Sequence, residues 1–160
     1  MNTSTKKGQC AVTDAIMRVM DSAFEPTYGE AWNRRQVSDA LALSSTHALL
    51  ISSKGTLIDA NYLDAAGFVL SRHAADEEEL LLIAVLPEHR AQGLGQILVD
   101  RLFDAASGRG VSRVFLEMRR GNPAVHLYHK LGFRPVGERP KYYKALNGDR
   151  IDAITFARSL

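Results

Sequence analysis

An apolar run over residues 80–86, followed by a turn with two glycines, constrains the fold of this chain more than any other feature. Seven consecutive apolar residues ended by a proline are typical of a buried strand. Apolar residues then recur at helical spacing over 95–106, so we expect the strand to turn directly into a helix. The start of a helix has unpaired backbone N–H groups, and its dipole favours negative charge. The sequence therefore predicts an anion-binding turn.

The turn itself has residues that suit a phosphate. Gly93 and Gly95 remove the side chains that would block close approach, and Arg90 can add a charge-assisted hydrogen bond at the rim. A dinucleotide-binding fingerprint would need a third glycine where the chain has Leu98, and the Gly-Lys-Ser/Thr of a P-loop is missing. Glycines that only make a turn are the alternative at this point.

The composition indicates one soluble domain. A chain of 160 residues suits a single core, and 46% hydrophobic with 24% charged residues is typical of a globular protein. The net charge of +2 comes from scattered Lys and Arg, so no nucleic-acid partner is expected. The polar residues 1–7 do not resemble a signal peptide, and no apolar run approaches the roughly 20 residues of a membrane-spanning helix. With its lone Cys10, the protein is expected to be cytoplasmic and without a membrane partner.

Hydrophobic periodicity predicts a mixed α/β domain over residues 1–160, with a polar tail over about residues 1–10. Asn122-Pro123 is typical of a helix start, and Asn147-Gly148 of a tight hairpin turn. The predicted elements are helices over 11–24 and 32–43, strands over 47–52, 57–58, 67–72 and 79–86, a helix over 95–106, a strand over 111–118, a short helix over 123–131, and a hairpin whose last strand is 151–156.

Two segments resemble those of a known family. Arg90-Ala-Gln-Gly-Leu-Gly95, after Leu82-Ile-Ala-Val85, resembles the acetyl-CoA pyrophosphate loop of the GNAT acetyltransferases, and residues 122–133 resemble their downstream motif. Within that superfamily, Leu116-Glu-Met-Arg119, Tyr142-Tyr143 and residues 148–154 resemble the ribosomal-protein-alanine N-acetyltransferases. The likeness is strong from about residue 67 onward and weak before it. It implies a single GNAT domain with a central, mostly antiparallel sheet flanked by helices, acetyl-CoA as cosubstrate and no metal.

The resemblance also implies direct transfer of an acetyl group from the thioester to an amine, which must be neutral to attack. An α-amino group with a pKa of about 7.7–8.0 is roughly a tenth neutral at pH 7, so one carboxylate is a reasonable base. Glu117 matches the glutamate of the family's strand, and Tyr128 matches the tyrosine that protonates the departing thiolate. Without the family, Glu117 would be the solvated face of a strand and Tyr128 the buried face of a short helix.

Ligand contacts follow from the same resemblance. The strand would bind the pantetheine arm and the turn the pyrophosphate, which gives an acetyl-CoA-binding set of Ile83, Ala84, Val85, Arg90, Ala91, Gln92, Gly93, Leu94, Gly95, Gln96, Asn122 and Tyr128. The spacing from Asn122 to Tyr128 is one residue shorter than in the family, so Gly121 is an alternative for the asparagine position.

Three residues are candidates for the acceptor side. Tyr142 and Tyr143 match hairpin tyrosines that border the peptide entrance. Glu79 ends the acidic run 76–79 and could face the amine, although that run reads more simply as a solvated loop.

His126 and His129 have the spacing of a metal pair but no further ligands, and are interpreted as surface residues.

Three functions remain open on the sequence. The first is acetylation of a protein N-terminus, that of an alanine-starting small-subunit ribosomal protein. The second is acetylation of a small amine, because residues 24–33 depart from the family's Pro-Trp-Ser/Thr segment on the acceptor side. The third is a non-catalytic acetyl-CoA-binding module, against which Glu117 and Tyr128 both count.

Overall fold

The computed structural model describes residues 3–59 and 62–160. Its helices are α1 (Thr3–Ala23), α2 (Arg34–Leu41), α3 (Leu94–Gly108) and α4 (Val125–Lys130), with short 3-10 turns η1 (Pro26–Tyr28), η2 (Tyr62–Asp64) and η3 (Pro87–His89). Its strands are β1 (Thr46–Ser52), β2 (Leu57–Ile58), β3 (Ala65–Ala74), β4 (Glu77–Val85), β5 (Arg113–Arg119), β6 (Arg134–Lys144) and β7 (Arg150–Ser159). The predicted α/β class and the order of the elements are confirmed. None of the helices described combines the length and apolar character needed to span a bilayer.

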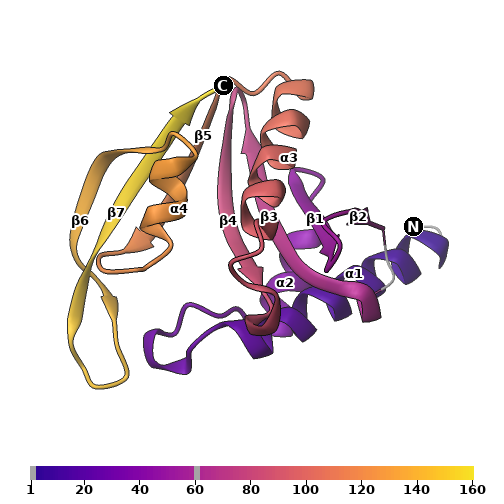
Figure 1. Cartoon of the computed structure of the whole chain (residues 1–160), viewed down its shortest axis with the longest axis horizontal. Helices are drawn as coiled ribbons and strands as arrows, with labels where there is room; N and C mark the ends of the chain where they lie inside the picture. Colours follow the sequence, from indigo (N-terminus) through magenta and orange to yellow (C-terminus); the bar gives the residue numbers. More distant parts are fainter. Residues whose placement is uncertain (1–2, 60–61) are drawn as a thin grey trace.

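The seven strands form one sheet in the order β2-β1-β3-β4-β5-β7-β6. Every neighbouring pair is antiparallel except β4 and β5. This parallel pair is short, because residues 77–79 pair with residues 113–115 and the strands then separate. Figure 1 shows the two halves of the sheet diverging from the end at which the chain terminates. The predicted, mostly antiparallel sheet is therefore open in its middle.

Two clusters of buried side chains cover opposite faces of the sheet. Phe68 and Leu70 of β3 pack with α1, whereas Val69 between them packs with α3. Successive side chains of a strand point to opposite faces, so helices on both sides bury residues 65–71 of β3. The same arrangement buries alternate residues of β4 and partly buries those between them, which explains the uninterrupted apolar run over 80–86.

The first two helices differ from the predicted ones. Helix α1 begins at Thr3, so the described part of the polar tail expected over about residues 1–10 is helical, and Cys10 lies exposed on this helix. Residues 1 and 2 of that tail lie outside the described residues. Residues 7, 8 and 10 of α1 are exposed and Thr13 is buried, so the segment over 7–10 has no reason to show apolar periodicity. Helix α2 starts later than predicted, at a capping box formed by Asn33 and Gln36.

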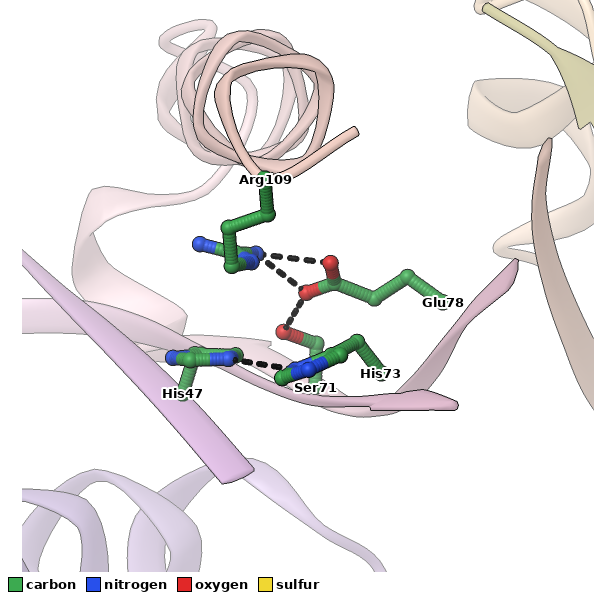
Figure 2. A network of polar contacts seen from close by, with 5 residues as sticks. All are labelled: His47, Ser71, His73, Glu78 and Arg109. Atoms are coloured by element: carbon green, nitrogen blue, oxygen red, sulfur yellow. Dashed lines mark hydrogen bonds and ion pairs between the residues drawn. The ribbon is translucent and has the colours of Figure 1, made fainter. Parts of the chain in front are cut away.

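The acidic run also departs from prediction. Residues 77–79 begin β4 rather than forming a solvated loop, and Glu78 is fully buried. Arg109, at the end of α3, places one nitrogen 2.6 and 2.7 Å from the two carboxylate oxygens of Glu78, and Ser71 donates to Oε1 at 2.5 Å (Figure 2). A buried carboxylate is costly unless it is paired and hydrogen-bonded. The strand can therefore include this acidic residue because β3 and α3 supply its partners.

Two histidines lie beside this network in Figure 2. The rings of His47 and His73 stack with 5.1 Å between centroids, and Nε2 of His47 lies 2.9 Å from Nδ1 of His73. Burial, followed by the positive charge of Arg109, lowers the pKa of His47. A neutral His47 suits this contact, because one of the two facing nitrogens must accept the hydrogen bond.

Candidate active site

A cleft of about 840 Å³ opens where β4 and β5 separate. Residues 80–85 of β4 line one wall and residues 116–119 of β5 line the other. Tyr128 of α4, Tyr143 of β6 and most of residues 23–32 close its remaining sides. The cleft is thus assembled from segments that are far apart in the sequence.

The wall formed by β4 is irregular in a way that suits a ligand. Leu70 of β3 pairs with Leu82, and Ser71 pairs with Leu80, so Leu81 is an extra residue that bulges from the strand. Beyond residue 79 no pairing with β5 continues, which leaves backbone groups on this edge of β4 without a strand partner. Ile83, Ala84 and Val85 line the cleft here, where the pantetheine amides were expected.

The turn before α3 has the geometry of an anion site. Gly93 is the N-cap of α3 with a φ of +83°, a left-handed conformation that favours glycine. Ala91 is also left-handed, with a φ of +58°. A hollow of about 370 Å³ at this turn is lined by Val85, His89, Arg90, Ala91, Gly93, Leu94, Gly95, Gln96, Leu127 and Lys130. Gln92 is exposed and lies outside this lining.

Two features of the hollow bear on a phosphate. Lys130, at the end of α4, adds a positive charge that the sequence reasoning missed, because α4 meets the turn only in the folded chain. A Cβ on Gly95 would lie 3.2 Å from Cδ2 of Leu127, so the turn approaches α4 closely. The hollow therefore brings the start of a helix and basic side chains together.

Arg90 lines both the cleft and the hollow, but its side chain is already engaged. Its Nε donates to the carbonyl of Val85 at 3.2 Å, and one terminal nitrogen donates to the carbonyl of Ala23 at 2.8 Å. Arg90 thereby ties the end of α1 to the end of β4. Its contact with a phosphate stays a prediction.

Glu117 lines the cleft from β5, as predicted for a base that must reach an acceptor. Its side chain is 19% exposed. Nε of Arg139 lies 3.2 Å from Oε2, and the hydroxyl of Thr155 donates to the same oxygen at 3.4 Å. The carboxylate is thus held loosely within the cleft.

Tyr128 is buried in α4 and yet lines the cleft. Its ring packs edge-on against Phe133, with 5.7 Å between centroids. Burial and, to a lesser degree, the negative charge of Glu30 raise the pKa of Tyr128, so its hydroxyl keeps its proton at neutral pH. The structure therefore gives this residue both a packing role and a place beside the cleft.

The loop before α4 accommodates the spacing from Asn122 to Tyr128, which is one residue shorter than in the family. Helix α4 begins at Val125, later than the predicted start, and the side chain of Asn122 accepts a hydrogen bond from the N–H of Ala124 at 2.9 Å. Gly121 has a φ of +84°, and a Cβ there would meet no atom within 4 Å. Both Gly121 and Asn122 line the cleft.

The three residues predicted for the acceptor side are placed differently. Tyr143 lines the cleft, and burial followed by the charges of Glu117 and Glu30 raises its pKa to about 12. The half-exposed Tyr142 packs edge-on against Tyr143 at 5.2 Å and lies outside the lining. Glu79 also lies outside, with its carboxylate 3.2 Å from Arg72, because β4 and β5 are still paired at this residue.

Sequence reasoning missed a charged cluster formed where the end of β5 meets the connection between α1 and α2. The guanidinium of Arg119 lies 3.6 Å from the ring centroid of Tyr28, and Nε of Arg119 lies 3.3 Å from Oε1 of Glu30. Burial raises the pKa of Glu30 against the opposing charge of Arg119. All three residues line the cleft. The one available signal was that Arg119 stands two residues after Glu117, on the same face of the strand.

Residues 14–133 match the acetyltransferase (GNAT) family. The chain belongs to this family. The [Ribosomal protein bS18]-alanine N-acetyltransferase of Escherichia coli strain K12 is 41% identical over 93 residues, which cover 58% of this chain and 62% of that protein. This GNAT chain therefore matches less than two thirds of the length of that relative.

Two longer matches agree with this assignment. The N-alpha-acetyltransferase RimI of Mycobacterium tuberculosis is 34% identical over 142 residues, covering 88% of this GNAT chain and 80% of that protein. The crystal structure of the ribosomal-protein-S18-alanine N-acetyltransferase from Escherichia coli superposes with a TM-score of 0.75 at 27% identity, covering 99% of this chain and 90% of that one.

The cleft fits acetyl-CoA, the cosubstrate of GNAT acetyltransferases. The unpaired edge of β4 offers backbone groups to an extended chain with amides, and the hollow at α3 offers N–H groups and basic side chains to a diphosphate. In the described residues, no group of three or more His, Cys, Asp or Glu side chains is placed to hold a metal ion, and His126 and His129 are exposed.

Proposed function

We propose that this GNAT protein is an N-acetyltransferase that transfers the acetyl group of acetyl-CoA to the α-amine of a protein N-terminus. One observation carries the proposal: the cleft that begins at the anion-binding turn also contains Glu117 and Tyr128, and continues to Tyr143. The names of the relatives support an alanine-starting ribosomal protein of the small subunit as the acceptor.

In this proposal Glu117 removes a proton from the acceptor's ammonium group, directly or through a water molecule. The neutral amine then attacks the thioester carbonyl, so that a C–N bond forms as the C–S bond breaks. Tyr128, whose hydroxyl is protonated at neutral pH, gives that proton to the departing thiolate and regains one as the new amide nitrogen loses its second proton. The hairpin tyrosines, Tyr143 above all, would border the acceptor.

A small amine is the second candidate acceptor. Residues 24–33 depart from the family segment expected between the first two helices, and most of them line the cleft. The carboxylates that line this cleft would pair with the ammonium groups of many amines. The change affects the identity of the acceptor much more than the binding of acetyl-CoA.

The test is mass spectrometry of the protein with acetyl-CoA and three kinds of acceptor: an alanine-starting peptide, the same peptide with a blocked N-terminus and an internal lysine, and a panel of small amines. Acetylation of the α-amine alone is the expected result. Modification of small amines only would overturn the proposed acceptor. No product, although acetyl-CoA at 100 times its Kd stabilises the protein by about 2.7 kcal/mol, would indicate a binding module instead.

A further inference from the structure

Two carboxylates from different parts of the chain line the cleft. Glu117 belongs to β5, and Glu30 belongs to the connection between η1 and α2. Each side chain is 19% exposed, so each is largely removed from bulk water and still accessible from the cleft. The proposed mechanism uses Glu117 and leaves Glu30 without a role.

Arg119 holds the carboxylate of Glu30 in this position. The side chain of Arg119 is 12% exposed, stacks on Tyr28, and brings Nε within 3.3 Å of Oε1 of Glu30. The contact is an ion pair between two largely buried side chains. The desolvation cost of a buried ion pair can exceed its attraction, so stability alone does not explain this pair.

Glu30 lies where it acts on the two tyrosines that line other sides of the cleft. After burial, which is the largest cause, the charge of Glu30 raises the pKa of Tyr128 on α4. After burial and Glu117, it also raises the pKa of Tyr143 on β6. Glu30, Glu117, Tyr128 and Tyr143 all line the one cleft in which an acceptor amine must lie for the proposed transfer.

We infer that Glu30 binds the acceptor's ammonium group before proton transfer, with Arg119 and Tyr28 as positioning residues, while Glu117 takes the proton. This inference rests on the proposed N-acetyltransferase function and adds how the cleft selects a cationic amine. An α-amine arrives mostly protonated at neutral pH. A hydrogen bond between an ammonium and a carboxylate is roughly twice as strong as one between neutral groups.

Glu30→Gln tests the inference because it removes the charge and keeps the shape. We expect KM for the alanine peptide to rise about tenfold, the loss of one charge-assisted hydrogen bond, with little change in kcat or in the Kd of acetyl-CoA. Asp39→Asn is the matched control, since it removes an exposed carboxylate of α2 that lies outside the cleft and should keep the wild-type KM.

Two unreactive ligands separate charge recognition from a general disturbance of the loop. The alanine peptide with an N,N-dimethylated terminus keeps the positive charge but cannot form the amide, and the N-acetylated peptide is neutral. Glu30→Gln should raise the Ki of the dimethylated peptide about tenfold and leave that of the acetylated peptide unchanged. Equal changes for both peptides, or none, would overturn the inference.

Failure of the proposed acceptor has a different signature, because the wild-type protein would then leave the alanine peptide unmodified. The comparison of wild type with Glu30→Gln is in that case made on the amine that the wild type does acetylate, and an unchanged KM overturns the role of Glu30. The absence of any acetylated amine would overturn both proposals.

Discussion

The two ends of the β4–β5 pair hold their carboxylates in opposite ways. At the closed end, where the strands are paired, Glu78 is fully buried and its oxygens lie 2.5 to 2.7 Å from Ser71 and Arg109. At the open end, Glu117 is partly exposed, and its contacts with Arg139 and Thr155 measure 3.2 and 3.4 Å. Short bonds from several directions make a carboxylate part of the framework, whereas a loosely held one in a cleft is available to a ligand.

Glu117→Gln should have the largest effect on activity. Removal of a general base lowers kcat by about 10²- to 10⁴-fold. The Kd of acetyl-CoA and the melting temperature should stay at the wild-type values, because Glu117 contributes little to the core. Steady-state kinetics with the alanine peptide provides the measurement, and an unchanged kcat would remove Glu117 from the proposed mechanism.

Glu78→Gln should affect stability instead. Breaking a buried ion pair costs 3–5 kcal/mol, and because Arg109 is 25% exposed we expect the low end, about 3 kcal/mol. Urea unfolding measures this loss, and kcat per folded molecule should be unchanged. Glu77→Gln is the control, since its half-exposed pair with Arg113 should contribute at most about 1 kcal/mol. If Glu78→Gln also lowered the free energy of unfolding by at most about 1 kcal/mol, the closed end would not depend on this network.

Tyr128→Phe tests the group that belongs to both the core and the cleft. The phenylalanine retains the packing against Phe133, so the melting temperature should change little. Loss of the proton donor should lower kcat by about 10²-fold. A variant with wild-type kcat and acetyl-CoA affinity would restrict Tyr128 to packing.

The smallest expected effect is on alkaline stability. A tyrosine in the unfolded chain titrates near pH 10, whereas the pKa of Tyr143 in the folded protein is about 12. Between these values the folded state binds more protons, so the free energy of unfolding falls as pH rises. Tyr143→Phe removes this contribution and should make the fall less steep in melts between about pH 9 and 12. Equal slopes for the two proteins would contradict the raised pKa of Tyr143.

Predictions from the sequence succeeded where the deciding interactions are local. The helix after Gly93 and the hairpin around Asn147-Gly148 lie where they were expected, because turn chemistry acts over a few residues. Glu117 and Tyr128 were proposed from motifs, and both line the cleft. The helix over residues 3–10 and the strand over residues 77–79 were not predicted, because polar residues were assumed to have no regular structure.

The sequence by itself determined the α/β order of elements, the strand that turns into a helix at the glycines, and the family. Only the tertiary structure decided which of three consecutive glutamates is buried, and that Glu30 meets Arg119. Strand alternation assigns Glu78 and Glu79 to opposite faces, but not to the core or the solvent. That choice depends on Arg109 and Ser71, and long-range partners of this kind leave no periodic pattern in the sequence.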